Sequence, residues 1–124
     1  MARLLIVDDE ESDLLLLKSY LEAEHELLVA RNGEEALKLY LRHPIDVVVT
    51  DIKMPRGDGI ELISALRGLD RDASIVAISG QEPHKLAIAQ MAGAVAILSK
   101  PLIPELLLEA VAKAAQQREE GSTD

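Results

Sequence analysis

Five short apolar runs recur along the chain, each bounded by polar or turn-forming residues. The run Val47–Val49 is entirely β-branched, which is typical of strands. Its lack of alternation between apolar and polar positions indicates a strand that is buried on both faces. The run Leu4–Val7 has the same unbroken character and ends in acids. The predicted strands are Leu4–Val7, Glu26–Ala30, Asp46–Thr50, Ser74–Ser79 and Val95–Leu98.

Between these runs, apolar residues recur at helical spacing. The predicted helices are Ser12–Glu24, Glu34–Arg42, Gly59–Leu66, Pro83 to about Ala92, and one from Pro104 that fades into the polar stretch Gln116–Asp124. Proline at a helix start and glycine just past a helix end support the fourth of these, with Gly93 as its stop. The faces expected to be buried are Leu14, Leu17 and Leu21, widened by Leu15 and Leu16, in the first helix, and Ala36, Leu37, Tyr40 and Leu41 in the second.

Strands and helices alternate five times, without internal repeats or low-complexity segments. Because each parallel pair of strands needs a crossover connection, this alternation predicts an α/β fold: a single doubly wound, five-stranded parallel sheet with helices on both faces. Alternation leaves the strand order open, and we expect the flavodoxin-like order 2-1-3-4-5, the common solution for five units. We expect one domain over residues 1–118, followed by residues 119–124 as a polar tail or the start of a linker.

The charge balance narrows the classes of function. Thirteen basic and 22 acidic residues give a formal net charge of −9, which argues against direct binding to nucleic acid or membranes and suits a protein that holds cations. The chain has no cysteine, which excludes disulfides, thiolate metal sites and cysteine nucleophiles. No apolar run reaches the roughly 18 residues of a membrane span, and the first residues do not resemble a signal peptide, so we expect a cytoplasmic protein.

Distinctive polar residues follow four of the five predicted strands. They are Asp8 and Asp9 after the first, Asp51 after the third, Ser79 after the fourth and Lys100 after the fifth. The carboxyl ends of parallel strands lie along one edge, so the three acids should meet if the first and third strands are neighbours. Adjacent carboxylates repel one another unless a counter-ion joins them, and oxygen ligands suit Mg²⁺ or Mn²⁺. Each residue alone has a commoner explanation, such as helix-dipole compensation or a loop position, but all of them at one edge by chance is improbable.

Phosphoryl transfer onto a carboxylate is the chemistry that fits this set. Aspartate serves as a covalent nucleophile in such reactions, and the charge of the transferring group calls for a metal ion and a lysine. We therefore expect Asp51 to be the nucleophile, Asp9 a direct metal ligand and Asp8 a second acid of the metal site. Lys100 would pair with the phosphoryl group, and the Ser79 hydroxyl would donate a hydrogen bond to it.

Taken in order, these motifs resemble the response regulator receiver domain of two-component signalling, over about Arg3–Gln117. The segments that carry the resemblance are Leu4–Glu11, Val47–Pro55, Gly57–Gly59, Ala77–Gly80, Ala92–Ala94 and Leu98–Pro101. The resemblance implies that Asp51 accepts a phosphoryl group from the phosphohistidine of a sensor histidine kinase or a histidine phosphotransfer protein. It also implies that Mg²⁺ is bound by Asp9, Asp51 and the backbone carbonyl of Lys53, with Asp8 contributing mainly through water.

Activation in that family couples the phosphoryl group to a distant surface. The resemblance implies that the Ser79 hydroxyl bonds the phosphoryl group and that the surface of the fourth helix, fifth strand and fifth helix shifts toward a partner-binding form. It also implies a cis bond between Lys100 and Pro101. Two residues depart from the family pattern: Ile97 stands where an aromatic switch residue is usual, and Leu102 stands where phenylalanine is frequent.

Three alternatives lead to other functions. A flavodoxin-like redox protein would cradle a phosphate in its first loop, where Asp8–Glu11 would repel one. A metal-dependent phosphatase would need a second acid close to Asp51 and a cap, for which 124 residues leave no room. We therefore expect no enzyme, only self-phosphorylation and self-dephosphorylation, with a downstream protein partner or a missing C-terminal effector domain receiving the signal. Ile97 keeps one alternative open, a pseudo-receiver that binds partners without being phosphorylated.

Overall fold

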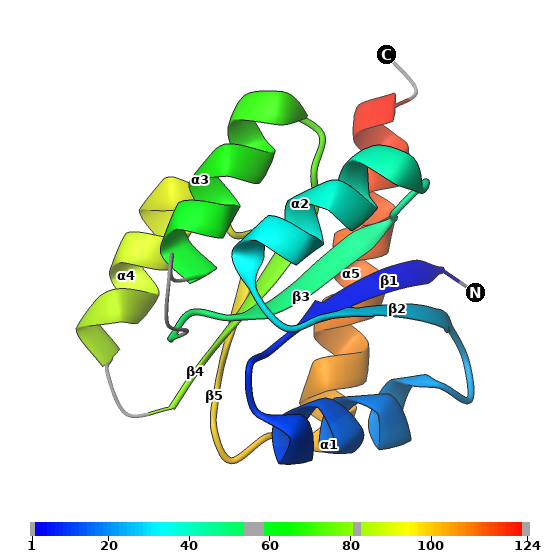
Figure 1. The fold of residues 1–124 in the computed structure, drawn as a ribbon, viewed down its shortest axis with the longest axis vertical. Helices are drawn as coiled ribbons and strands as arrows, with labels where there is room; N and C mark the ends of the chain where they lie inside the picture. Colours follow the sequence, from blue (N-terminus) through cyan, green and yellow to red (C-terminus); the bar gives the residue numbers. More distant parts are fainter. Residues whose placement is uncertain (1, 54–58, 81–82, 123–124) are drawn as a thin grey trace.

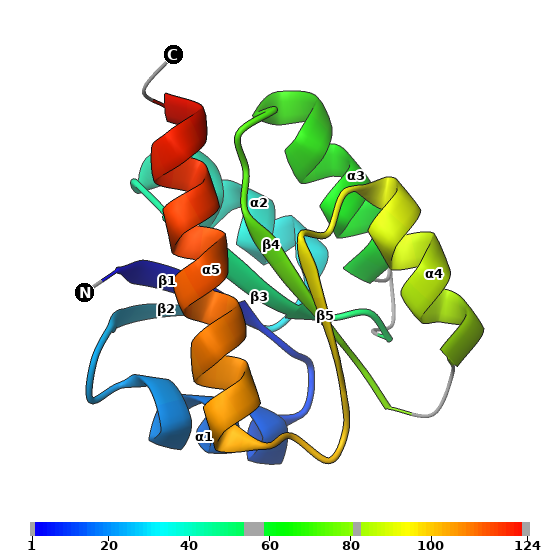
Figure 2. The same ribbon diagram turned by 180° about the vertical axis from the view of Figure 1, so that it is seen from behind.

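The computed structural model describes residues 2–53, 59–80 and 83–122. Five parallel strands form one sheet in the order β2-β1-β3-β4-β5, which confirms the predicted fold class and strand order (Figures 1 and 2). The strands are β1 (Arg3–Val7), β2 (Glu26–Ala30), β3 (Val47–Asp51), β4 (Ile75–Ser79) and β5 (Ala96–Ser99). Because β1 and β3 are neighbours, with Val7 opposite Thr50, the residues that follow them lie at the same place on the carboxyl edge.

Helices cover both faces of the sheet. Within the described residues they are α1 (Glu11–Leu21), α2 (Gly33–Arg42), α3 (Gly59–Leu69), α4 (Pro83–Ala92) and α5 (Pro104–Ser122). Figures 1 and 2 show α1 and α5 on one face and α2, α3 and α4 on the other. Helix α4 ends at Ala92 and is followed by Gly93 as its stop, as predicted; the φ of +125° at Gly93 is one that glycine adopts without strain.

Burial on both faces explains why the apolar runs show no alternation. Successive residues of a strand point to opposite faces. Accordingly, Leu5 and Val48 pack in the core beneath α2 and α3, whereas Leu4 and Val47 pack in the core beneath α1 and α5. All four side chains are buried. A strand covered on both sides needs apolar residues at every position, which is the pattern the sequence has.

The helices bury fewer leucines than the sequence suggested. Leu15 and Leu16 are 57% and 41% exposed, so they do not widen the buried face of α1. Leu41 of α2 is 69% exposed and is not part of the buried face expected for that helix. A helix turns by about 100° per residue, so a residue beside a buried position points well away from the sheet. A run of leucines does not by itself reveal which of them face the core.

The last helix is longer than its polar sequence suggested. Helix α5 spans 19 residues and continues to Ser122, through the stretch from Gln116 where we expected it to fade. Glutamine, arginine and glutamate are good helix formers, so a polar stretch can continue a helix without an apolar face. The helix crosses the predicted domain limit at residue 118, which stays a prediction. Neither α5 nor any other helix among the described residues is long and apolar enough to cross a membrane.

A hydrogen-bonded cluster lies at the edge of the sheet where the strands begin, and we call Tyr40, Asp70 and Arg118 the amino-edge cluster. The Tyr40 hydroxyl donates to Asp70 Oδ2 at 2.7 Å, and Arg118 Nη1 donates to the same oxygen at 3.0 Å. Arg118 also donates to the backbone carbonyl of Asp72 at 3.0 Å. The cluster joins α2, the end of α3 and α5, and so connects helices on opposite faces of the sheet.

Candidate functional site

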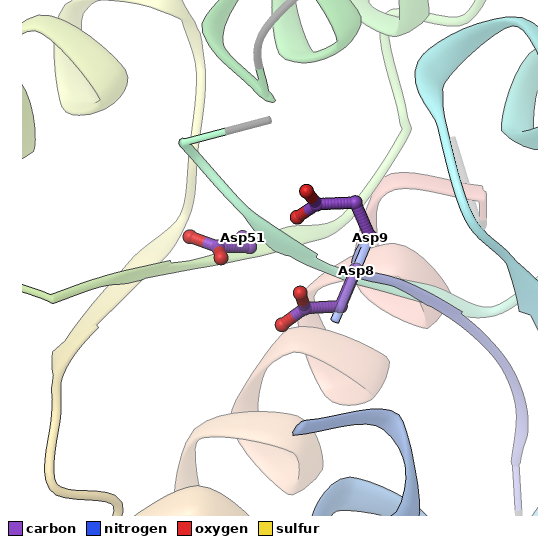
Figure 3. Close-up of side chains that lie close together, drawn as sticks. All are labelled: Asp8, Asp9 and Asp51. Atoms are coloured by element: carbon purple, nitrogen blue, oxygen red, sulfur yellow. The ribbon is translucent and has the colours of Figure 1, made fainter. Parts of the chain in front are cut away.

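The ends of β1 and β3 bring three carboxylates together. Asp8 and Asp9 directly follow β1, and Asp51 is the last residue of β3. One oxygen from each of the three side chains lies within 4.8 Å of the others. Figure 3 shows the three carboxylates extending to the same side of the chain. The strand order therefore produces the acidic cluster that was expected at this edge.

The two deeper carboxylates are poorly hydrated. Asp8 and Asp51 are 2% and 5% exposed, whereas Asp9 is exposed. Burial raises the pKa of Asp8 to about 7; the Glu10 N–H, which donates to Asp8 at 3.0 Å, opposes this rise, and the charge of Asp51 adds to it. Burial also raises the pKa of Asp51, although nearby donors oppose it. Strongly perturbed acids in a hollow are typical of functional sites.

Asp51 is constrained by backbone and side-chain contacts. The Lys53 N–H donates to Asp51 Oδ1 at 3.1 Å, and Lys100 Nζ lies 3.5 Å from Oδ2. Helix α3 begins behind Asp51 with Gly59, whose N–H donates to the Ile52 carbonyl at 3.1 Å. A Cβ atom at Gly59 would collide with the Asp51 carbonyl oxygen and lie 2.6 Å from Ile52 Cα. Only glycine lets α3 pack this closely against the end of β3.

Lys100 lies between two acids from different elements. Its Nζ is 2.9 Å from Asp13 Oδ2 and 3.5 Å from Asp51 Oδ2. Its backbone N–H donates to the Ser79 carbonyl at 2.8 Å, and its bond to Pro101 is cis, as the resemblance implied. Burial by itself would lower the pKa of Lys100, but the hydrogen bond to Asp13 and the charges of Asp51 and Asp13 outweigh it and raise that pKa. The side chain therefore stays a charged ammonium at neutral pH.

Asp13 is the residue of this site that sequence reasoning missed. It lies in the first turn of α1, where acids are common because they compensate the helix dipole. Its contact with Lys100 joins residues that are 87 positions apart. The signal that could have identified it was spacing. Asp13 follows Asp9 by four residues, so a helix beginning between them keeps Asp13 near the ends of the strands.

Ser79 and Ile97 occupy different surroundings. Ser79 is the last residue of β4 and is 3% exposed. In the strand register Asp51 pairs with Ile78, so Ser79 lies one residue further along the neighbouring strand. Ile97 is partly buried against the core beneath α2, α3 and α4. Residues 54–58, which carry part of the predicted motifs, lie outside the described residues. Ser79 thus belongs to the carboxyl edge, and Ile97 belongs to the core beside it.

The acidic cluster opens onto solvent through a hollow of about 590 Å³, whose lining includes Asp9, Asp51 and Lys100. A second cavity of about 250 Å³, lined mainly by apolar residues of α1 and of the loop after β5, lies next to it. The Asp13–Lys100 ion pair borders both. The larger hollow gives an anionic group access to Asp51 from solvent.

The donor set fits a hard divalent cation. Asp8, Asp9 and Asp51 offer carboxylate oxygens close enough to meet around one ion, and Mg²⁺ and Mn²⁺ prefer oxygen ligands. A cation would also offset the negative charge that raises the pKa of Asp8.

Parallel strands in the order 2-1-3-4-5, with clustered acids and a lysine at the carboxyl edge, define the class of receiver-type signalling domains. A family model described as the response regulator receiver domain matches residues 4–112. The chain belongs to this family, whose members function in two-component systems.

Individual relatives agree with this assignment. The chain is 38% identical over 112 residues to the chemotaxis protein CheY of Halobacterium salinarum, covering 88% of this chain and 92% of that protein. A crystal structure of a response regulator receiver domain protein from Clostridium thermocellum matches with a TM-score of 0.91 and 28% identity, covering 96% of this chain and 98% of that one. The sensory/regulatory protein RpfC of Xanthomonas campestris is 30% identical over 119 residues, which cover 91% of this chain but only 16% of that protein. The domain therefore also occurs as a small part of longer proteins.

Proposed function

We propose that this domain is a phosphorylation-dependent switch in which Asp51 accepts a phosphoryl group from the phosphohistidine of a sensor histidine kinase or a histidine phosphotransfer protein. The phosphorus–nitrogen bond to the imidazole breaks, and a phosphorus–oxygen bond to an Asp51 carboxylate oxygen forms. One observation carries the proposal. Asp51 is a 5%-exposed carboxylate that opens onto a hollow, 3.5 Å from an ammonium group and beside two further acids.

The proposed metal ligands are Asp9, Asp51 and the backbone carbonyl of Lys53, with Asp8 contributing mainly through water. Mg²⁺ or Mn²⁺ bound there would neutralise the charge that develops on the phosphoryl oxygens. The closeness of the three carboxylates supports this assignment. The Glu10 N–H, which donates to Asp8 at 3.0 Å, keeps that carboxylate oriented within the acidic cluster.

Lys100 and Ser79 are the proposed partners of the transferred phosphoryl group. Lys100 would pair with it through its ammonium, and Ser79 would donate a hydrogen bond from its hydroxyl. The 3.5 Å approach of Lys100 to Asp51 supports the first role, and the position of Ser79 one residue beyond Asp51 on β4 supports the second. The hydrogen bond from the Lys100 N–H to the Ser79 carbonyl holds the two residues beside each other at the ends of β4 and β5.

The proposed output surface is formed by α4, β5 and α5. These elements and the loops that flank them carry exposed large apolar side chains: Ile88, Met91, Val95, Ile103 and Leu106. Exposed apolar side chains on neighbouring elements could contribute to such a binding surface. A downstream protein partner, or an effector domain attached at the C-terminal side, would bind there when the population shifts on phosphorylation.

Ile97 is the proposed switch residue between the site and this output surface. Together with Lys100, Ile103 and Leu106 it lines a hollow of about 420 Å³. A movement of Lys100 toward a phosphoryl group would therefore change the walls of a hollow that the output surface shares. Because Ile97 has no ring to rotate, we propose that it responds by repacking against its neighbours.

The proposed activity is limited to the domain itself: self-phosphorylation from phosphodonors and self-dephosphorylation, without turnover of a separate substrate. We propose no direct contact with nucleic acid or a membrane, because a net charge of −9 repels both. The cytoplasm is the proposed location, since a phosphohistidine donor would be formed there.

The experiment that tests this function is intact-protein mass measurement after incubation with acetyl phosphate, with and without Mg²⁺. We expect a gain of one phosphoryl group that needs Mg²⁺ and is lost in Asp51→Asn. Asp46→Asn is the matched control, because Asp46 directly precedes β3, at the opposite end from Asp51, and its substitution should leave the gain intact. If wild-type protein binds Mg²⁺ but gains no mass, the domain is a pseudo-receiver that works through partner binding alone.

A further inference from the structure

The ammonium of Lys100 lies closer to Asp13 than to the acceptor carboxylate. Lys100 Nζ is 2.9 Å from Asp13 Oδ2, a hydrogen-bonded ion pair, but 3.5 Å from Asp51 Oδ2, at the outer limit for such a bond. The side chains of Lys100 and Asp13 are 29% and 31% exposed, so the pair lies at the rim of the hollow. In the resting domain, the cation that would serve the phosphoryl group is therefore bound mainly to another acid.

The position of Asp13 is fixed by the packing of α1. Leu14 and Leu17, both buried, hold this helix on the sheet. Asp13 lines the same hollow as Asp51, and among the described residues Lys100 is the cation with which it forms an ion pair. Asp13 also lies outside the segments that carry the family resemblance. Its contact with Lys100 is therefore a feature of this chain that the motifs do not account for.

Phosphorylation would change the competition for Lys100. A phosphoryl group carries nearly two negative charges at neutral pH, whereas the Asp51 carboxylate carries at most one. Because the attraction between charges grows with their product, the balance between the two acids would move toward Asp51. Lys100 has a flexible four-carbon stem, so it can make this short movement without any change in the backbone.

We propose that Asp13 is a positioning residue that holds the Lys100 ammonium at the rim of the hollow in the resting domain and releases it when Asp51 carries a phosphoryl group. This inference rests on the proposed function of Asp51. Without the charge of Asp13, Lys100 would be available at once, and a phosphoryl-like anion would bind more tightly. Asp13 would also lose its partner on phosphorylation, which makes the first turn of α1 sensitive to the state of the site.

Binding of beryllofluoride, a stable mimic of a phosphoryl group on aspartate, measures this competition without turnover. Because the chain has no tryptophan, calorimetric titration at saturating Mg²⁺ is the suitable readout. We expect Asp13→Asn to bind beryllofluoride about fivefold more tightly than wild type, an effect typical of losing one partly exposed ion pair. Asp13→Glu restores the charge on a side chain one methylene longer, and it should return toward the wild-type affinity.

Glu11→Gln is the matched control. It removes one negative charge from the same turn of α1, but Glu11 pairs with Arg31 at 3.0 Å, and no ion pair joins it to Lys100 among the described residues. Its beryllofluoride affinity should equal that of wild type. Thermal melting of each variant checks that the fold is intact. An unchanged or weakened affinity in Asp13→Asn, or an equal gain in Glu11→Gln, would overturn the positioning role.

A spectroscopic readout tests the release of Lys100 directly. The carboxyl ¹³C resonance of Asp13, assigned by its loss in Asp13→Asn, should shift when beryllofluoride binds wild-type protein at fixed pH. A resonance that does not move means that the ion pair persists, which contradicts the proposal. If wild-type protein neither binds beryllofluoride nor gains mass from acetyl phosphate, the proposed function of Asp51 fails, and this inference fails with it. If it binds and only the Asp13 results are negative, the positioning role alone fails.

Discussion

Polar side chains gather at both edges of the sheet, and the two groups differ in how their charge is balanced. At the carboxyl edge, burial raises the pKa of Asp51 despite the nearby ammonium of Lys100. At the amino edge, burial by itself would also raise the pKa of Asp70, but hydrogen bonds from the Tyr40 hydroxyl, a backbone N–H and Arg118 outweigh it and lower that pKa. The surroundings therefore disfavour the ionised form of an aspartate at the carboxyl edge and favour it at the amino edge.

The difference follows from the number of acids that share each cation. The amino-edge cluster sets one carboxylate against a guanidinium and a hydroxyl. At the carboxyl edge, the four acids Asp8, Asp9, Asp13 and Asp51 lie near the ammonium of Lys100, and Lys53 is a second cation that lines the hollow. A surplus of buried negative charge destabilises a fold unless a ligand completes the site. We infer that the amino-edge cluster stabilises the fold, whereas the surplus of acids at the carboxyl edge destabilises it and is kept for the function of the site.

The largest effect that would separate the two edges is a dependence of stability on pH in metal-free protein. Asp8 has a pKa of about 7 when folded, against 3.8 for the ordinary group. An acid with a raised folded pKa adds stability that is complete below its unfolded pKa and is lost as the pH rises through the folded one. Between pH 5 and 7.5, the free energy of unfolding should therefore fall by on the order of 3 kcal/mol on account of Asp8. Urea unfolding in the presence of a chelator measures this slope.

Two comparisons make that measurement specific. Asp8→Asn should flatten the slope, and saturating Mg²⁺ should do the same for wild-type protein because the cation favours the ionised acids. Asp70→Asn should leave the slope unchanged, since a lowered pKa gives a contribution that is complete above pH 3.8 and is lost only at lower pH. The same slope in Asp8→Asn as in wild type would contradict the strain attributed to the carboxyl edge.

The next effect compares the two ends of α3. Gly59 packs against the backbone of Asp51 and Ile52, so Gly59→Ala should destabilise the domain by about 2 kcal/mol and slow phosphorylation of Asp51. Gly68 lies near the amino edge, where an added Cβ would meet nothing within 4 Å, and Gly68→Ala should stabilise the domain by up to about 1 kcal/mol through helix propensity. Urea unfolding gives the sign of each change. Equal effects of the two substitutions on the free energy of unfolding would contradict the prediction that close packing of Gly59 against Asp51 stabilises the domain.

The fold was predictable because its strands are buried on both faces. Runs such as Val47–Val49 are typical of buried strands, and five alternating strand–helix units are compatible with few topologies. The phase of the helices was harder to predict. Leu15, Leu16 and Leu41 lie beside buried positions in leucine-rich stretches, where several faces of the helix are apolar enough to pack on a sheet. Residue type alone does not decide between those faces, because the supporting surface comes from distant parts of the chain.

The part of the site that lies directly at the ends of the strands was predictable from the sequence. Asp8, Asp9 and Asp51 follow from the rule that parallel strands share a carboxyl edge, once the strand order places β1 beside β3. Asp13 was missed because helix-dipole compensation already explains an acid in a first turn. The amino-edge cluster was also missed. Tyr40 and Arg118 lie 30 and 48 residues away from Asp70 in the sequence, and the three residues form no motif. Contacts of this kind depend on helix lengths and crossing positions, which composition and spacing do not encode.

The smallest expected effect concerns the amino edge. Tyr40→Phe removes the hydrogen bond to Asp70 and should lower the free energy of unfolding by about 1 kcal/mol, because Asp70 keeps Arg118 as its partner. Tyr20→Phe is the matched control: among the described residues the Tyr20 hydroxyl makes no hydrogen bond, so its loss should leave stability nearly unchanged. Neither substitution should alter the Mg²⁺ affinity, which calorimetric titration measures. A loss of Mg²⁺ affinity in Tyr40→Phe would mean that the two edges are coupled through the sheet and that their charge balances are not independent.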